Sequence, residues 1–284
     1  MTVHEYALPR SLPEALDLLA ARGPDLLIIA GGTIAMPLVN EGLSLPEAVM
    51  GLRHAGLGAI DRTGDALRIG ATATLTRLLE QDAIEMLREA ARNTAAWSVR
   101  NMATVGGNLF TPPPGGDVAV ALLALDATVV LASARGERTM PLAEFFTGFL
   151  TTAIADDELL VEIRVPLSSA AASTAFLKLG RKHANTPSVV TVAVRLAWDG
   201  ATIADARIAL GAVGPHPIRA LRAEQVLRGT SLDRDSIAAA AAAAAADCEP
   251  ATDGIASAWY RRRMCELEVG RALERARDAR KDGG

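Results

Sequence analysis

Two glycine pairs constrain this chain more than any other feature of its sequence. Each pair stands between an apolar segment and a small polar residue, in "IIAGGT" (28–33) and in "ATVGGN" (103–108). Glycine tolerates positive φ, and without a side chain it lets successive backbone N–H groups converge into a concave nest for an anion. A single pair is more often a tight turn after a strand. Two pairs in one predicted domain favour a ligand that carries more than one phosphate.

The second pair lies in an unusual stretch, "RNMATVGGNLFTPPPGGD" (100–117). The amide of Asn108 can donate and accept hydrogen bonds at once, which suits it to orienting a ligand. The carboxylate of Asp117 could accept from a ribityl or ribose hydroxyl or cap a helix that starts at Val118, and one residue could do both. Pro112–Pro114 are expected to stiffen the span between the two polar residues.

The usual signatures of nucleotide sites and of catalysis are missing. Without G-x-x-x-x-G-K-[ST] a P-loop enzyme is improbable, and without G-x-G-x-x-G behind the first predicted strand the sequence argues against a Rossmann dinucleotide site. The four histidines are scattered, and neither G-x-S-x-G nor H-E-x-x-H occurs. We therefore assign no catalytic residue and no metal site to this chain, and expect redox chemistry carried by a bound cofactor.

Composition narrows the class of protein further. A chain of 284 residues suggests roughly two domains, and its formal charge of −4 gives no general attraction to nucleic acid. Its two cysteines, Cys248 and Cys265, are too few for a four-cysteine iron–sulfur cluster or a structural zinc site. No secretory signal and no apolar run of about 20 residues stands out, so we expect a cytoplasmic protein without a membrane span.

The order of predicted elements indicates two domains of mixed helix and strand, with a boundary near residues 167–172. Before the boundary we expect helices over residues 12–22, 82–99, 117–126 and 142–149, a helix starting near Thr74 or Thr76, and strands over residues 25–30, 66–70, 127–133 and 158–166. The small, polar "LSSAAAST" after Pro166 is interpreted as a linker. Beyond it, three alternating segments predict an antiparallel meander, and two helices follow. The first of these is the alanine run Ala238–Ala246, interpreted as a closely packed helix.

Five segments, in order and nearly end to end, resemble the FAD-binding medium subunit of the molybdenum hydroxylases, the family of xanthine dehydrogenase and aerobic carbon monoxide dehydrogenase. "AGGTIAMPLV" (30–39) is similar to the first flavin motif of the family, and "RNMATVGGNL" (100–109) to the second. The segments that resemble its C-terminal domain are "FLKLGRK" (176–182), "IALGAVGPHPIRA" (208–220) and "SAWYRRRMCELEVGRAL" (257–273).

The resemblance implies an α+β fold and a set of cofactor contacts. Residues 1–168 are expected to form a PCMH-type, flavin-oxidase-like FAD-binding domain of two α/β subdomains (about 1–55 and 56–168), and residues 172–284 a smaller C-terminal α+β domain. By the same resemblance, two loops surround the flavin pyrophosphate, a carboxylate contacts the cofactor and a lysine lies near the flavin. The matching residues are Ala30, Gly31, Gly32, Thr33 and Ile34 in the first loop, Thr104, Val105, Gly106, Gly107 and Asn108 in the second, and Asp117 and Lys178.

The sequence departs from the family pattern at two places. Thr33 stands where the family often has His, Gln or Asn, and Ile34 where it often has Ser, so the first loop is expected to rely on backbone contacts. "TPPPGG" (111–116) replaces a stretch that contains Ala and Asp, although the spacing to Asp117 is preserved.

The function implied by the resemblance is electron transfer. A large partner subunit would carry a molybdopterin cofactor and a small one two [2Fe-2S] clusters, FAD on this chain would pass electrons to an external acceptor, and the assembly would be a dimer of heterotrimers. The alternative is a self-contained FAD-dependent oxidase or reductase, which needs catalytic groups over the flavin and often a covalent link to His or Cys. No convincing candidate for such a group is found. A third possibility, an assembly protein that has lost its flavin, is disfavoured by the intact glycine pairs.

Overall fold

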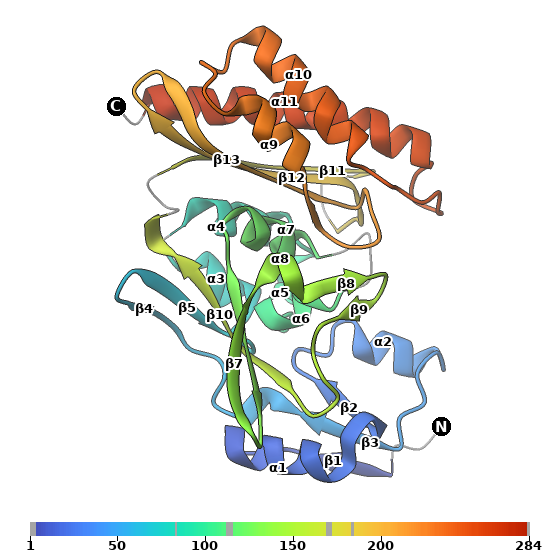
Figure 1. Cartoon of the computed structure of the whole chain (residues 1–284). Helices are drawn as coiled ribbons and strands as arrows, with labels where there is room; N and C mark the ends of the chain where they lie inside the picture. Colours follow the sequence, from blue (N-terminus) through green and yellow to red (C-terminus); the bar gives the residue numbers. More distant parts are fainter. Residues whose placement is uncertain (1–3, 83, 112–115, 169–171, 183–184, 283–284) are drawn as a thin grey trace.

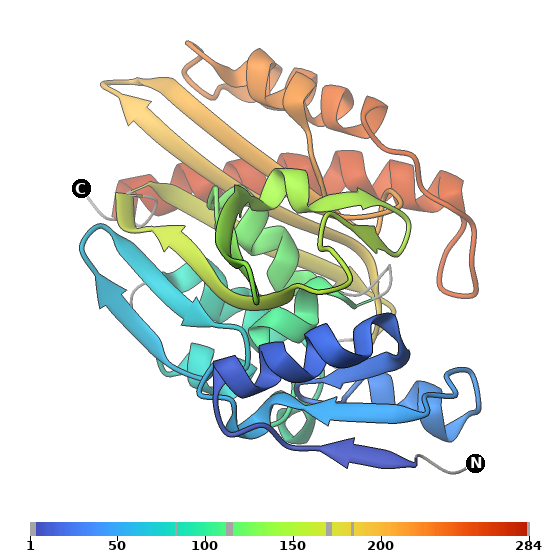
Figure 2. The ribbon, with the colours of Figure 1, turned by 60° about the horizontal axis from the view of Figure 1, so that its bottom comes forward.

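The computed structural model describes residues 4–82, 84–111, 116–168, 172–182 and 185–282. The chain forms three stacked parts: a small N-terminal sheet, a larger sheet with helices in the middle, and a C-terminal sheet covered by three helices (Figures 1 and 2). Pro112–Pro114 and residues 169–171 of the expected linker lie outside the described residues. Within those residues, no helix is long and apolar enough to cross a membrane.

The N-terminal part is a parallel three-stranded sheet in the order β1–β3–β2. Ser11 caps the first helix as predicted, because its hydroxyl accepts a hydrogen bond from the backbone N–H of Glu14 at 3.3 Å. The buried side chains of this part pack against β6 and β10 of the middle sheet. Its elements are β1 (Glu5–Ala7), α1 (Leu12–Arg22), η1 (Gly23–Asp25), β2 (Leu26–Ile29), α2 (Ala35–Asn40), β3 (Ala48–Gly51) and η2 (Leu52–His54).

The middle part is a five-stranded antiparallel sheet in the order β4–β5–β10–β6–β7. Its strands are β4 (Ile60–Thr63), β5 (Ala66–Gly70), β6 (Thr128–Ser133), β7 (Gly136–Pro141) and β10 (Leu159–Pro166), with the hairpin β8 (Phe146–Gly148) and β9 (Thr151–Thr152). Its helices are α3 (Leu75–Leu79), α4 (Glu85–Asn93), α5 (Trp97–Arg100), α6 (Val105–Leu109), α7 (Asp117–Ala124) and α8 (Leu142–Phe145). All eight residues of α7 are buried, so this helix is the centre of the core.

Two predicted helices of the middle part differ from the structure. The one expected over 82–99 is two helices, α4 and α5, because Ala95 between them has φ +52° and ends the helical path. The Arg100 side chain holds the break by donating to the carbonyl of Ala95 at 2.7 Å. The helix expected over 142–149 ends at Phe145, where the chain turns into the β8–β9 hairpin.

The C-terminal part is an antiparallel four-stranded sheet, and its first three strands form the predicted meander. Its elements are β11 (Ser173–Gly180), β12 (Ser188–Asp199), β13 (Thr202–Gly211), β14 (Ile218–Arg219), α9 (Leu221–Leu227), α10 (Arg234–Ala246) and α11 (Ala258–Asp282). One face carries α9, α10 and α11, and the other lies on α4 and α7 (Figure 1).

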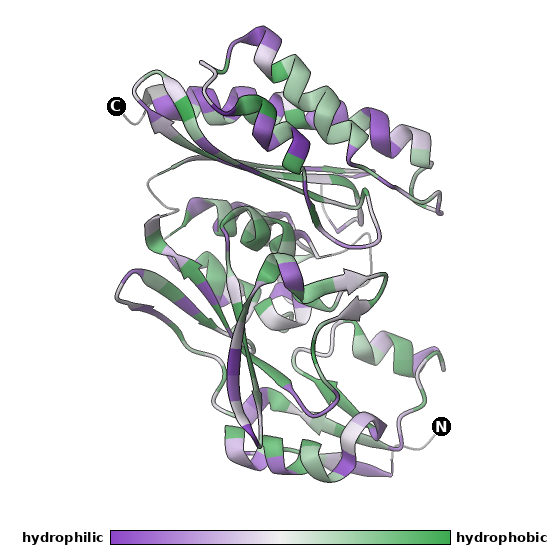
Figure 3. Cartoon of the chain, viewed as in Figure 1, coloured by the Kyte–Doolittle hydropathy of each residue, from purple (hydrophilic) through white to green (hydrophobic). Residues whose placement is uncertain are grey.

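The alanine run forms α10, which Figure 3 colours pale green along most of its length. The helix packs on α9 and α11, and four of its alanines are buried, as expected for a closely packed helix: Ala240, Ala241, Ala244 and Ala245.

Candidate functional site

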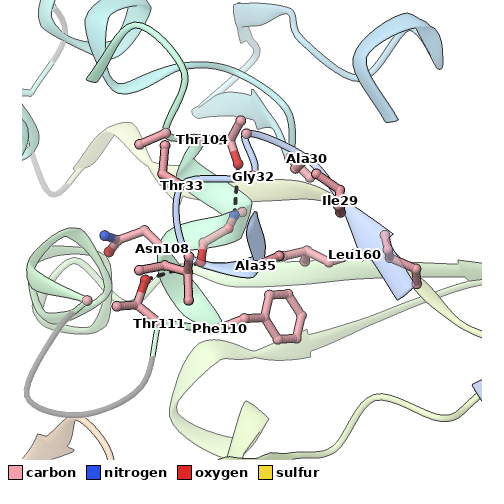
Figure 4. A pocket seen from close by; sticks show the side chains of 18 of the residues that line it. Ile29, Ala30, Gly32, Thr33, Ala35, Thr104, Asn108, Phe110, Thr111 and Leu160 are labelled. Atoms are coloured by element: carbon pink, nitrogen blue, oxygen red, sulfur yellow. Dashed lines mark hydrogen bonds between the residues drawn. The ribbon is translucent and has the colours of Figure 1, made fainter. Parts of the chain in front are cut away.

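A cavity of about 950 Å³ lies where the three parts of the chain meet. Its volume is at the upper end of the range of about 300–1,000 Å³ that ligand sites occupy. Residues of the first loop and of the second glycine motif surround the same space (Figure 4). The predicted residues that line the cavity are Ala30, Gly31, Gly32, Thr33, Ile34, Thr104, Gly106, Gly107, Asn108, Asp117 and Lys178. Val105 does not line it, because its side chain is fully buried behind the wall.

The first loop connects β2 to α2 and lies directly on the second motif. A Cβ on Gly31 would stand 2.0 Å from the carbonyl oxygen of Met102, so only glycine allows the two backbones to approach this closely. Gly32 has φ +70°, a left-handed conformation that glycine adopts without strain.

The first loop also presents unpaired hydrogen-bond donors. The backbone N–H groups of residues 31–35 donate to no acceptor among the described residues, although all five residues line the cavity. Backbone N–H groups are strong donors that are nearly always paired when they are shielded from water. A run of free donors at a cavity wall therefore suits a ligand rich in negatively charged acceptor oxygens.

The second motif forms the short helix α6 instead of a left-handed turn. Thr104 is its N-cap and accepts a hydrogen bond from the N–H of Gly107 at 3.0 Å. The N–H of Gly106 donates to the carbonyl of Ala71 at 2.9 Å, and that of Asn108 to the carbonyl of Thr104 at 3.0 Å. The prediction of an amide nest at this pair is wrong, because its amides are engaged within the protein.

The glycines of the second motif instead serve close packing. A Cβ on Gly106 would lie 2.7 Å from the carbonyl oxygen of Ala71, and one on Gly107 would lie 2.8 Å from the hydroxyl of the Thr104 cap. Because neither glycine carries a side chain, α6 lies directly against the turn that follows β5, and the cavity wall is smooth there.

Asn108 caps the central helix. Its Oδ1 accepts a hydrogen bond from the N–H of Ala119 at 3.0 Å, and its side chain is buried. Helix α7 begins at Asp117 itself, with Gly116 in a left-handed conformation at the N-cap position. Capping by the Asp117 side chain is therefore a wrong expectation, and Asn108 supplies the cap instead.

The carboxylate of Asp117 is held by three donors from the C-terminal part. Its Oδ1 accepts from the hydroxyls of Ser188 at 2.6 Å and Thr191 at 2.8 Å, and its Oδ2 pairs with Nζ of Lys178 at 2.6 Å. Lys178 also donates to the carbonyl of Asn93 at 2.9 Å. Sequence reasoning missed both hydroxyls, because no local pattern links residues so far apart along the chain.

A second buried carboxylate, Glu158, lines the cavity near the start of β10. Its oxygens accept from Arg138 at 2.6 and 2.7 Å and from the N–H of Ala155 at 2.8 Å. The hydrogen bond from Arg138 holds the pKa of the Glu158 carboxyl below its ordinary value, and the backbone donor acts in the same direction. Glu158 is thus a charged, fully paired part of the wall.

The remaining wall is largely apolar. Phe110 packs edge-on against Phe145 with ring centroids 5.8 Å apart, and Ile154 and Leu160 lie along the same wall. No His or Cys of the described residues lines the cavity, and these residues contain no cluster of three or more His, Cys, Asp or Glu that could hold a metal.

Comparison with known protein families covers nearly the whole chain. Residues 2–168 match the family described as FAD binding domain in molybdopterin dehydrogenase, and residues 174–276 match the CO dehydrogenase flavoprotein C-terminal domain. The chain is 34% identical over 277 residues to the carbon monoxide dehydrogenase medium chain of Hydrogenophaga pseudoflava, with 96% of each chain covered. It is 32% identical to the caffeine dehydrogenase subunit beta of Pseudomonas sp. (strain CBB1), with 98% of this chain and 96% of that one covered.

Solved structures show the same arrangement. Carbon monoxide dehydrogenase from Hydrogenophaga pseudoflava superposes with a TM-score of 0.94 at 34% identity, covering 98% of both chains. Quinoline 2-oxidoreductase from Pseudomonas putida 86 superposes with a TM-score of 0.90 at 30% identity and the same coverage. These relatives are oxidoreductases or their subunits. The chain therefore belongs to the FAD-binding medium subunits of the molybdenum hydroxylases, the family that includes the medium chain of carbon monoxide dehydrogenase.

Proposed function

We propose that this chain holds FAD in the cavity and passes electrons from the [2Fe-2S] clusters of a partner subunit to an external acceptor. The observation that carries the proposal is the row of unpaired N–H groups at residues 31–35, on the wall of a cavity large enough for a dinucleotide. A pyrophosphate offers the charged acceptor oxygens that these donors lack.

The residues present fit FAD along the length of the cavity. The first loop would hold the pyrophosphate through its backbone, and Thr104, Gly106 and Gly107 would form the smooth wall beside it. Phe110 and Leu160 offer an apolar surface suited to an aromatic ring. When bound, FAD supplies electron transfer in steps of one or two electrons.

The chain's own side chains position the cofactor and keep water from it. Asn108 fixes the start of α7, and Asp117 holds the Lys178 ammonium at the wall near the C-terminal part. We propose that Lys178, Asp117 and Asn108 set the electrostatic surroundings of the flavin, and that Val105 supports this wall from behind.

The wall favours electron transfer over a substrate reaction on this chain. Two of the lining carboxylates, Asp117 and Glu158, are engaged in ion pairs, and the third, Asp156, is exposed. No His or Cys of the described residues lines the cavity to form a covalent link to the flavin. This disfavours the self-contained oxidase or reductase.

The other cofactors are proposed to reside on partner chains. Both cysteines are buried side by side in the C-terminal core, with their sulfur atoms 3.3 Å apart, so neither is placed to ligate an exposed cluster. We propose a large molybdopterin-binding subunit and a small iron–sulfur subunit as partners, assembled as a dimer of heterotrimers.

The first experiment is spectroscopic. Purified protein is expected to be yellow, to show a flavin spectrum and to release FAD on acid extraction. The control is the same extraction on protein unfolded and refolded without FAD. A colourless protein that takes up no added FAD would refute the cofactor assignment.

The second experiment addresses the partners. Co-expression with its gene neighbours is expected to yield a complex with a large molybdenum-containing chain and a small iron–sulfur chain. The control is the chain expressed alone, which should lack both partners and any substrate oxidation. Repeated isolation of the chain alone as an active oxidase would support the alternative function.

A further inference from the structure

Helix α7 is fastened to the C-terminal sheet at both of its ends by an aspartate. Asp117, at its start, binds residues of β11 and β12. Asp126, two residues beyond its end, binds Arg195 of β12 at 2.7 Å, Arg207 of β13 at 2.9 Å and Arg219 of β14 at 3.0 Å. Each aspartate therefore links one end of α7 to the C-terminal sheet, which lies above this helix in Figure 1.

Only the Asp117 end belongs to the cavity wall. Asp117, Lys178 and Ser188 line the cavity, whereas Asp126 and its three arginine partners do not. Thr191 does not line it either and is 1% exposed, so it can act on a ligand only through the Asp117 carboxylate.

The side chains of the Asp117 cluster are closely packed and largely shielded from solvent. The side chains of Asp117 and Lys178 are 6% and 8% exposed, and Ser188 is 1% exposed. A buried carboxylate persists in its charged form only when donors replace the lost water, and here every identified donor comes from the C-terminal part. Ser188 and Thr191 hold Oδ1 of Asp117, and Lys178 pairs with Oδ2 of the same carboxylate. The position of Lys178 at the cavity wall therefore depends on these two hydroxyls.

We propose that Thr191 and Ser188 are positioning residues of the cofactor site, and that through Asp117 they couple FAD binding to docking of the C-terminal part on α7. The inference rests on the proposed function, because it requires FAD in the cavity. FAD would contact cavity walls from the C-terminal part and from the rest of the chain. Its binding therefore favours the state in which the C-terminal part is packed on α7, called the docked state here. By thermodynamic linkage, the docked state must favour FAD to the same extent.

The test compares FAD affinity in three variants of the full chain. Thr191→Val preserves shape but removes the hydroxyl, Thr191→Ser restores a hydroxyl, and Asp126→Asn weakens the anchor at the other end of α7. Because couplings of this kind typically amount to about 5–150-fold, we expect Thr191→Val to raise the Kd for FAD at least about fivefold. Thr191→Ser should return it toward the wild-type value. Asp126→Asn loosens the docking of the C-terminal part at a place away from the cavity, so it should lower the melting temperature and also raise Kd, and an unchanged Kd in this variant would overturn the coupling to docking.

A second measurement uses the wild-type chain alone. FAD should slow hydrogen exchange of the amides at the start of β12, around residues 188–192, which belong to the other side of the interface. Equal FAD affinity in Thr191→Val and wild type, or exchange in β12 that FAD does not alter, would overturn the coupling. If the wild-type chain binds no FAD at all, the proposed function itself fails, and the two failures are thereby distinguished.

Discussion

Replacing Gly31 with alanine tests whether the first loop must lie directly on the second motif. A Cβ here would stand 2.0 Å from the carbonyl oxygen of Met102 and 2.7 Å from its carbonyl carbon, whereas ordinary contact begins at about 3.4 Å. Both atoms belong to the backbone, so no change of rotamer relieves the clash and the loop must move. Overpacking of this kind typically lowers the free energy of unfolding by about 1–3 kcal/mol.

The same movement should also weaken FAD binding. The free N–H groups of residues 31–35 would be displaced from the pyrophosphate. A hydrogen bond to a charged group contributes about 1.5–3 kcal/mol, and about 1.4 kcal/mol corresponds to a tenfold change in Kd. Loss of a single amide contact should therefore raise the Kd for FAD by about tenfold to a hundredfold.

Two measurements separate these effects. Urea unfolding of the FAD-free protein gives the change in stability, and titration with FAD, followed by flavin fluorescence, gives Kd. Gly254→Ala is the matched control, because a Cβ there meets nothing within 4 Å and neither quantity should change. A folded Gly31→Ala protein with wild-type FAD affinity would refute the role assigned to the first loop.

Three further predictions concern the walls of the cavity. Asn108→Ala removes the side-chain cap of α7 and leaves the N–H of Ala119 only its bond to the carbonyl of Gly116, so it should lower the free energy of unfolding by about 0.5–2 kcal/mol in urea titrations; an unchanged midpoint would argue against the cap. Thr104→Val removes the N-cap of α6 at a cost of about 1 kcal/mol, while Thr104→Ser should retain wild-type stability. The folded-state pKa of Glu158 lies below its unfolded value, so its pairing with Arg138 stabilises the fold above the ordinary value of 4.5 and is lost as pH falls through the lowered pKa. Arg138→Gln should therefore flatten the acid side of the melting-temperature profile, and an acid side identical to wild type would contradict this account.

Elements with local signals were predictable from the sequence. Ser11 caps α1 and Thr74 caps α3, each at a predicted helix start, because a hydroxyl that accepts from an N–H three residues ahead is a local interaction. The first glycine pair likewise leaves its strand in a loop, where Gly32 has positive φ. These positions depend on neighbours in the chain, and a single sequence contains that information.

The second glycine pair shows where such reasoning ends. Its glycines have the same local context as the first pair, but Gly106 packs on Ala71, a residue brought there by a different strand. Glycine required for close packing and glycine required for a nest are identical in sequence. The break at Ala95 was missed for the same reason, since Arg100 stabilises it from beyond the helix end.

The role of Asp117 depends even more on distant residues, because its three partners follow it by 61, 71 and 74 positions. A chain ending before β11 would retain the first loop and α6 but would lose every identified donor to this carboxylate. Removing one partner of a buried ion pair typically costs about 3–5 kcal/mol. Without these donors, α7 could not hold the Asp117 carboxylate in its present buried position. The C-terminal part is therefore a structural component of the cavity, and its docking determines whether the Asp117 end of the site exists at all.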